Sequence, residues 1–141
     1  MVRAVIDTNV LVSALMRCND DTPPAKVLND FRHGVLVLLY DERMMGEYQE
    51  VLQRPKFGLD PRLVDELLEL IRELGEPIDA AAFPGEVLDP DDRPFVDVAF
   101  TGRADILITG NVKDFPVGDA VRVITPRDWV EERNLRVIMT P

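Results

Sequence analysis

The sequence has little cysteine and no long apolar run. Its single cysteine, Cys18, excludes an internal disulfide and a zinc site built from several cysteines. The longest apolar run, Val35 to Tyr40, is far too short to cross a bilayer. The start of the chain, Met-Val-Arg before further apolar residues, lacks the architecture of a signal peptide. We therefore expect a single domain, residues 1–141, in the reducing cytoplasm and without a membrane anchor.

Basic residues are also scarce relative to acidic ones. The chain has 16 Lys and Arg against 26 Asp and Glu, which gives a formal net charge of −10. This balance argues against non-specific nucleic-acid binding, which depends on neutralising phosphates with Lys and Arg. An acidic excess can simply keep a protein soluble, or it can reflect carboxylates gathered for cations. The composition leaves both explanations open.

Strands and helices alternate along the sequence. Apolar runs predict strands at residues 2–6, 35–40, 76–79, 105–109 and 120–124. Apolar residues at helical spacing predict helices at about residues 8–17, 24–32, 42–53, 61–74, 92–102 and 125–133. This alternation favours right-handed crossovers and helices on both faces of a sheet. The predicted fold class is α/β, with three α/β/α layers and a central, mostly parallel five-stranded sheet.

Asp7 directly follows the first predicted strand. Open α/β sheets bind their ligands at the carboxyl ends of the strands, so this carboxylate could belong to a functional site. It could equally cap the following helix, because an aspartate side chain accepts free backbone N–H groups there. Taken alone, the residue favours the capping role.

Two further carboxylates lie on the core side of predicted helices. Met44 and Val51 mark the apolar face of the third helix, and Glu47 lies on its border. Asp92 lies in line with the apolar stripe of the fifth helix, and the run DPDD at 89–92 supplies more carboxylates than capping uses. A carboxylate half-turned to the core needs a partner, which can be an arginine or a cation.

Polar residues also follow the strand predicted at 105–109. Asn111 and Asp114 come just beyond its end, although Gly110-Asn111 also suits an Asx turn. Positions past neighbouring strand ends adjoin one another in a doubly wound sheet. Packed carboxylates raise each other's pKa, and divalent cations such as Mg²⁺ and Mn²⁺ remove that repulsion in oxygen-only sites. Asp97, in contrast, is expected to be solvated or to support the others.

Jointly these stretches resemble the PIN domain family of metal-dependent ribonucleases. The resemblance rests on IDTNVLVSAL, GEYQEVLQRPKF, DPDDRPFVDVAF, ADILITGNVKDF and VITPRDW, in that order. It extends to the branch described as toxins of type II toxin–antitoxin pairs. It implies a central parallel sheet between helices, and three or four acidic residues that hold Mg²⁺ or Mn²⁺.

The resemblance also assigns individual residues. The implied catalytic and metal-binding residues are Asp7, Glu47, Asp92 and Asp114. The implied substrate-binding or supporting residues are Asn9, Ser13 and Asn111. The fourth acidic position departs from the family's common Thr-x-Asp pattern, because Thr109-Gly110 is followed by a neutral asparagine. A branch of the family has this asparagine with an aspartate three residues later, as Asp114 is here.

The implied function is metal-dependent hydrolysis of RNA phosphodiester bonds. An antitoxin protein is the implied partner, and a homodimer is left open. One alternative is a degenerate PIN domain that binds RNA or protein without cutting, which Asn111 and the acidic charge favour. Another is a phosphoryl-transfer enzyme with Asp7 as nucleophile, as in haloacid-dehalogenase-like phosphatases. Asn9 disfavours that alternative, because those enzymes need a second aspartate at this position.

RNA binding by so acidic a chain would require a local basic rim. The candidate residues for such a rim are Arg17, Lys26, Arg43, Arg54, Lys56, Arg103 and Lys113.

Overall fold

The computed structural model of this chain describes residues 1–16 and 21–139. Arg17, Cys18 and the first part of the turn expected at 18–24 lie outside these ranges. Within them the strands are β1 (Val2–Ile6), β2 (Leu36–Tyr40), β3 (Glu76–Pro77), β4 (Ile106–Ile108) and β5 (Val123–Ile124). The α-helices of the described residues are α1 (Thr8–Met16), α2 (Pro23–Arg32), α3 (Glu42–Leu52), α4 (Pro61–Leu74), α5 (Arg93–Thr101) and α6 (Pro126–Met139). Short 3-10 helices are η1 (Pro55–Phe57), η2 (Pro90–Asp92), η3 (Val112–Asp114) and η4 (Gly118–Ala120).

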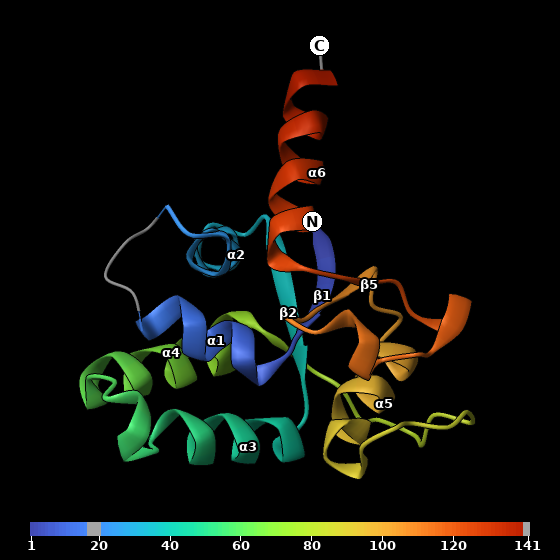
Figure 1. The fold of residues 1–141 in the computed structure, drawn as a ribbon, viewed down its shortest axis with the longest axis horizontal. Coiled ribbons are helices and arrows are strands. Elements are labelled where there is room, and N and C mark those ends of the chain that lie inside the picture. The colour runs from blue at the N-terminus through green and yellow to red at the C-terminus, as the bar shows by residue number, and fades with distance from the viewer. Residues whose placement is uncertain (17–20, 140–141) are drawn as a thin grey trace.

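All strand pairs in the sheet are parallel, and the strand order is β3-β2-β1-β4-β5. The central strand β1 pairs with both β2 and β4, and its residues Ala4, Val5 and Ile6 are fully buried. Burial on both faces is the environment that an apolar, non-alternating strand predicts. In Figure 1, α1 to α4 lie on one side of β1 and β2, and α5 lies on the other. The predicted three-layer α/β/α fold is confirmed.

The helix boundaries follow from capping residues. Asp41 and Asp60 accept hydrogen bonds from the first turns of α3 and α4, and Thr22 does the same for α2. Gly34 ends the α2 segment with a φ of +76°, a backbone conformation that glycine adopts without strain. These caps begin α2, α3 and α4 within one residue of where the sequence predicts.

The C-terminal helix is longer than expected. The sequence predicts an end near Arg133, whereas α6 continues to Met139. No glycine or proline interrupts this stretch, and the pairs Arg127–Glu131 and Glu132–Arg136 have the i,i+4 spacing that supports a helix. Figure 1 shows the end of α6 standing clear of the remaining elements. Among the described residues, no helix combines the length and apolar character needed to cross a membrane.

Strand order defines where a site can form. From β1 the chain proceeds outward through β2 and β3, then returns to the other side of β1 for β4 and β5. The sheet therefore has its topological switch point between β1 and β4. In open α/β sheets the crevice outside the carboxyl ends of such strands is the usual ligand site. Asp7 follows β1 and Thr109 follows β4 at this point.

Candidate functional site

Asp7 is held by the ends of both central strands. Its backbone N–H donates to the carbonyl of Ile108, and Thr109 Oγ1 donates to Asp7 Oδ2 at 2.8 Å. The other carboxylate oxygen, Oδ1, accepts the backbone N–H of Thr8 at 2.8 Å, so Asp7 does contact the start of α1. This is the first N–H of α1, not the second or third that a capping side chain binds, and the same side chain joins β1 to β4.

Burial works against ionisation of Asp7. Its side chain is almost enclosed, and desolvation raises its pKa above the ordinary value. The hydrogen bonds from Thr109 and Thr8 oppose this shift, whereas the negative charge of Asp114 adds to it. Two hydrogen-bond donors therefore fix the direction of the Asp7 side chain, and no positively charged group is among the causes of its pKa shift.

Glu47 reaches the same region from α3. This helix packs against α1, and Thr8 Oγ1 donates a short hydrogen bond to Glu47 Oε2. The neighbouring Tyr48 is fully buried and donates to the carbonyl of Ile6 at 2.5 Å, which ties α3 to the end of β1. Desolvation raises the pKa of Glu47, with further increases from Asp7 and Asp91. The prediction of a half-buried Glu47 is confirmed.

Asp92 lies where η2 meets α5. Its pKa is raised to about 7, first by burial and then by the charges of Asp7, Asp89, Asp114 and Glu47. Within the described residues the Asp92 side chain makes no capping hydrogen bond; Asp89 instead accepts the N–H of Asp91 at 2.9 Å. Capping therefore accounts for Asp89 and leaves Asp92 for another role.

The residues after β4 lie at the exposed edge of the site. Asn111 directly precedes η3 and Asp114 is its last residue, and both are exposed. The backbone N–H of Asn111 donates to Thr109 Oγ1 at 3.1 Å, while its side chain does not cap the described η3. The charge of Asp114 raises the pKa of both Asp7 and Asp92. Asp114 therefore acts electrostatically on the other carboxylates.

The polar residues of α1 differ in their relation to these carboxylates. Asn9 Oδ1 accepts the backbone N–H of Gly110 at 3.3 Å, which links the start of α1 to the loop after β4. Ser13 lies one turn further along α1, where it lines a small pocket with Thr22 and the following prolines. The structure thus connects Asn9 to the site but shows no contact between Ser13 and the carboxylates.

The donor set has the chemistry of a divalent-cation site. Asp7, Glu47, Asp92 and Asp114 offer only oxygen ligands. The charges of the other three raise the pKa of Asp92, and the charge of Asp7 also raises the pKa of Glu47. Nevertheless, in residues 1–16 and 21–139 no three His, Cys, Asp or Glu side chains are grouped in a way that could hold a metal ion. The carboxylates are therefore close enough for their charges to affect the pKa of Asp92. Their coordination of one shared metal ion stays a prediction.

Of the two roles expected for Asp97, solvated or supporting, its burial excludes the first and leaves the second. It is 2% exposed, and accepts hydrogen bonds from Arg93 Nη1 at 3.0 Å and Arg43 Nη1 at 3.2 Å. The backbone N–H of Phe83 adds a third at 2.7 Å. Both arginines neutralise the carboxylate, which allows its burial. The i,i+4 spacing of Arg93 and Asp97 is the sequence signal that could have indicated this pair.

Sequence analysis also omitted the threonines that orient the carboxylates. Thr8 contacts Asp7 through its N–H and Glu47 through its hydroxyl, and Thr109 donates to Asp7. Thr8 lies within IDTNVLVSAL and Thr109 within ADILITGNVKDF, so both belong to motifs that the sequence already singles out. Their side-chain partners depend on how β1, α3 and β4 meet.

Comparison with protein families gives a match to a family model described as PIN domain, over residues 3–113. The matched range includes Asp7, Glu47, Asp92 and Asn111 and ends just before Asp114. No curated protein matches the chain.

Among solved structures, the chain is similar to one from the crystal structure of VapBC2 from Rickettsia felis bound to a DNA fragment from their promoter. The TM-score is 0.57 and the sequence identity 17%, and the similarity covers 88% of this chain and 98% of that one. At this identity the similarity supports the fold alone.

Proposed function

The chain belongs to the PIN domain family, and from this premise we propose that it is a metal-dependent endoribonuclease. The observation that carries the proposal is the mutual effect of its carboxylates at the switch point of the sheet. Asp7, Glu47 and Asp114 all raise the pKa of Asp92, which reaches about 7. Carboxylates arranged in this way suit a divalent cation, which would reverse their repulsion.

The residues that would hold Mg²⁺ or Mn²⁺ are Asp7, Glu47, Asp92 and Asp114. A divalent cation bound there supplies Lewis acidity and lowers the pKa of a water that can attack phosphorus. Thr109 and the N–H of Thr8 orient Asp7, and the Thr8 hydroxyl orients Glu47. Asn9 holds the loop after β4 through Gly110, so that exposed Asn111 can contact the substrate.

We also propose the biological setting. The sequence resembles toxins of type II pairs, and the similar solved structure is of VapBC2 with promoter DNA. An antitoxin protein is accordingly the proposed partner, and RNA the proposed substrate. We place the protein in the cytoplasm as a single domain, with a homodimer as an additional assembly to examine.

The decisive experiment is calorimetric titration of Mn²⁺ into the wild type and into Asp7→Asn. Binding by the wild type that is lost in Asp7→Asn would support the metal site. Asp79→Asn is the matched control, because Asp79 is an exposed aspartate in the loop after β3. Cleavage of single-stranded RNA with Mg²⁺, and its loss in EDTA, would then support the reaction. Wild-type protein that fails to bind Mn²⁺ would contradict the mechanism.

A non-cutting PIN domain is the second candidate. Neutral Asn111 occupies the common acidic position, and the described carboxylates are not grouped for a metal ion. This candidate predicts RNA or protein binding that is independent of Mg²⁺, with no cleavage products after prolonged incubation. The calorimetric and cleavage measurements above therefore separate the two candidates.

A further inference from the structure

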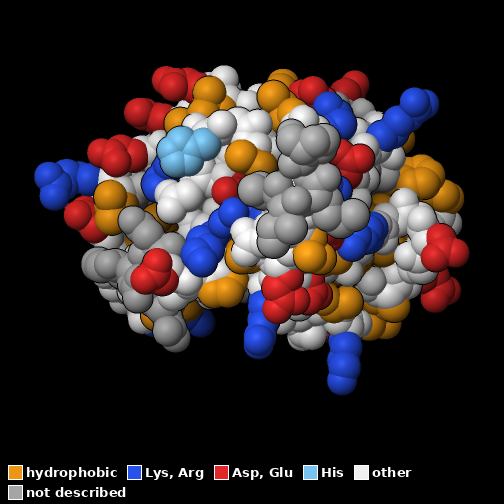
Figure 2. All heavy atoms as spheres, turned by 90° about the horizontal axis from the view of Figure 1, so that it is seen from above, with side chains coloured by type: hydrophobic (Ala, Val, Ile, Leu, Met, Phe, Trp, Pro, Cys, Tyr) orange, Lys and Arg blue, Asp and Glu red, His pale blue; other side chains and the backbone are white. Residues whose placement is uncertain are grey.

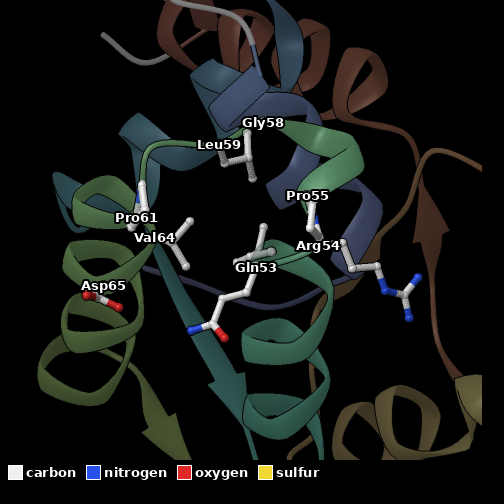
Figure 3. Close-up of a pocket in the computed structure, with 9 residues that line it drawn as sticks. Gln53, Arg54, Pro55, Gly58, Leu59, Pro61, Val64 and Asp65 are labelled. Carbon is white, nitrogen blue, oxygen red and sulfur yellow. The ribbon is translucent and has the colours of Figure 1, made fainter.

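A cavity of about 300 Å³ lies between the end of α3 and the start of α4, outside the carboxylate site. Its lining residues are Leu52, Gln53, Arg54, Pro55, Gly58, Leu59, Pro61, Val64 and Asp65. In Figure 3 the aliphatic side chains of Leu59 and Val64 point into the space enclosed by the two helices and η1. Its walls are therefore mainly apolar, with amide, guanidinium and carboxylate groups available at the margins.

The cavity is linked to the proposed active site by α3. Arg54 follows Glu47 by seven residues and lies just beyond the end of α3 at Leu52. In Figure 3 the Arg54 side chain extends away from the cavity. The positive charge of Arg54 lowers the pKa of Glu47, which is consistent with a position of Arg54 between the cavity and the carboxylates.

Arg54 can accept a new anionic partner. Glu50 binds it through Nε at 3.1 Å and Nη2 at 2.7 Å, which leaves Nη1 outside this pair. The two side chains are 44% and 61% exposed, and ion pairs in such settings contribute little stability. Exposed Lys56 lies two residues further on, with its ammonium 5.0 Å from the Phe57 ring. A phosphate could therefore bind Arg54 without a large loss of folding stability.

The face in Figure 2 intermingles Asp and Glu with Lys and Arg side chains instead of gathering the basic ones. At the α3–α4 cavity, Arg54 adjoins apolar walls, and exposed Lys56 lies two residues further along the chain. Proteins that bind single-stranded nucleic acid combine positive charge for the backbone with apolar or aromatic surfaces for the bases. A nucleotide matches both features.

We propose that this cavity is a nucleotide subsite, in which a base of the RNA substrate enters between Leu59 and Val64 while an adjacent phosphate binds Arg54. The Gln53 amide can both donate to and accept from a base edge. The inference rests on the proposed function, because it assumes an RNA strand at the carboxylates.

The test uses fluorescence anisotropy with labelled single-stranded RNA of about a dozen nucleotides, within the usual range of single-strand sites. EDTA prevents cleavage during binding. A parallel series of probes carries one abasic nucleotide at successive positions. The proteins are the wild type, Leu59→Trp to fill the cavity, and Arg54→Gln to remove the phosphate contact. Arg62→Gln is the charge-matched control, because Arg62 is 87% exposed on α4 and does not line the cavity.

Leu59→Trp should weaken RNA binding by roughly 5- to 100-fold, the range expected for one lost base contact. Arg54→Gln should weaken it and reduce the slope of log affinity against log salt by about 0.7, whereas Arg62→Gln should not. In the wild type, one abasic position should reduce affinity, and Leu59→Trp should abolish that positional effect. Circular dichroism checks that each variant is folded.

The outcomes separate this subsite from the nuclease activity. If the wild type cleaves RNA but both cavity variants bind all probes as it does, the subsite is overturned and the nuclease stands. If the wild type binds RNA without cleaving it and Leu59→Trp weakens binding, the subsite stands and the nuclease fails. If the cavity instead holds a protein partner, folded Leu59→Trp should bind RNA as the wild type does, and this result would also overturn the subsite. No wild-type RNA binding overturns the subsite.

Discussion

At the scale of single residues, Asp92 has the clearest energetic consequence. Its ordinary pKa of 3.8 is raised to about 7 by burial and by four neighbouring acidic groups. Between these two values the folded chain binds more protons at Asp92 than the unfolded chain does. Stability from this residue is therefore fully present below about pH 4 and is lost as the pH rises through 7. The ionised Asp92 carboxylate therefore destabilises the folded chain when no metal ion is bound.

Asp92→Asn should therefore stabilise the metal-free protein at pH 8 but have little effect at pH 4. We expect a gain on the order of 1 kcal/mol at pH 8, because Asp92 is only partly shielded from solvent. This gain corresponds to a rise in Tm of about 2–4 °C. Thermal unfolding in EDTA at both pH values measures it, with Asp79→Asn as the control. Equal changes in Tm at pH 4 and pH 8 would contradict the argument.

At the scale of elements, Asp97 connects α5 with two other segments. It accepts hydrogen bonds from Arg93 in its own helix, from Arg43 in α3 and from the backbone of Phe83. Arg93 also donates to the carbonyls of Phe83 and Gly85, which holds the loop before η2. This network fixes the loop that leads to Asp92 and thereby contributes to the geometry of the carboxylates.

Asp97→Ala should reduce the free energy of unfolding by about 3 kcal/mol, because it removes one partner from a buried ionic network. The loss should appear as a lower urea midpoint with little change in the denaturant slope. Asp79→Ala, at an exposed aspartate, should change stability by less than about 0.5 kcal/mol. A similarly small effect of Asp97→Ala would show that the network does not stabilise α5.

The elements also show which features the sequence could specify. The boundaries of α4 were predictable because Asp60-Pro61 opens the helix and Gly75 closes it. The half-burial of Glu47 was predictable from helical spacing, but its hydrogen bond to Thr8 joins residues 39 positions apart. Asp7 and Thr109 are separated by 102 positions. Such partners depend on packing between elements, which periodicity along one element does not encode.

At the scale of the whole molecule, β1 unites the two halves of the chain. It pairs with β2 on one side and β4 on the other, so the N-terminal and C-terminal parts of the sheet share their central strand. Without β1, each half keeps only a two-stranded pair, β2 with β3 or β4 with β5, and such a pair is marginally stable alone. We therefore expect unfolding as one cooperative unit, in agreement with the proposed single domain.

Calorimetry should show one unfolding transition with an enthalpy of about 100 kcal/mol near 60 °C, the value expected for a domain of this length. Since Mn²⁺ is proposed to bind at the junction of β1 and β4, it should shift the entire transition. At a free concentration about 100-fold above Kd, the expected stabilisation is about 2.7 kcal/mol. Two transitions, of which Mn²⁺ moves only one, would show that the strands flanking β1 unfold independently and that the metal reports on part of the chain.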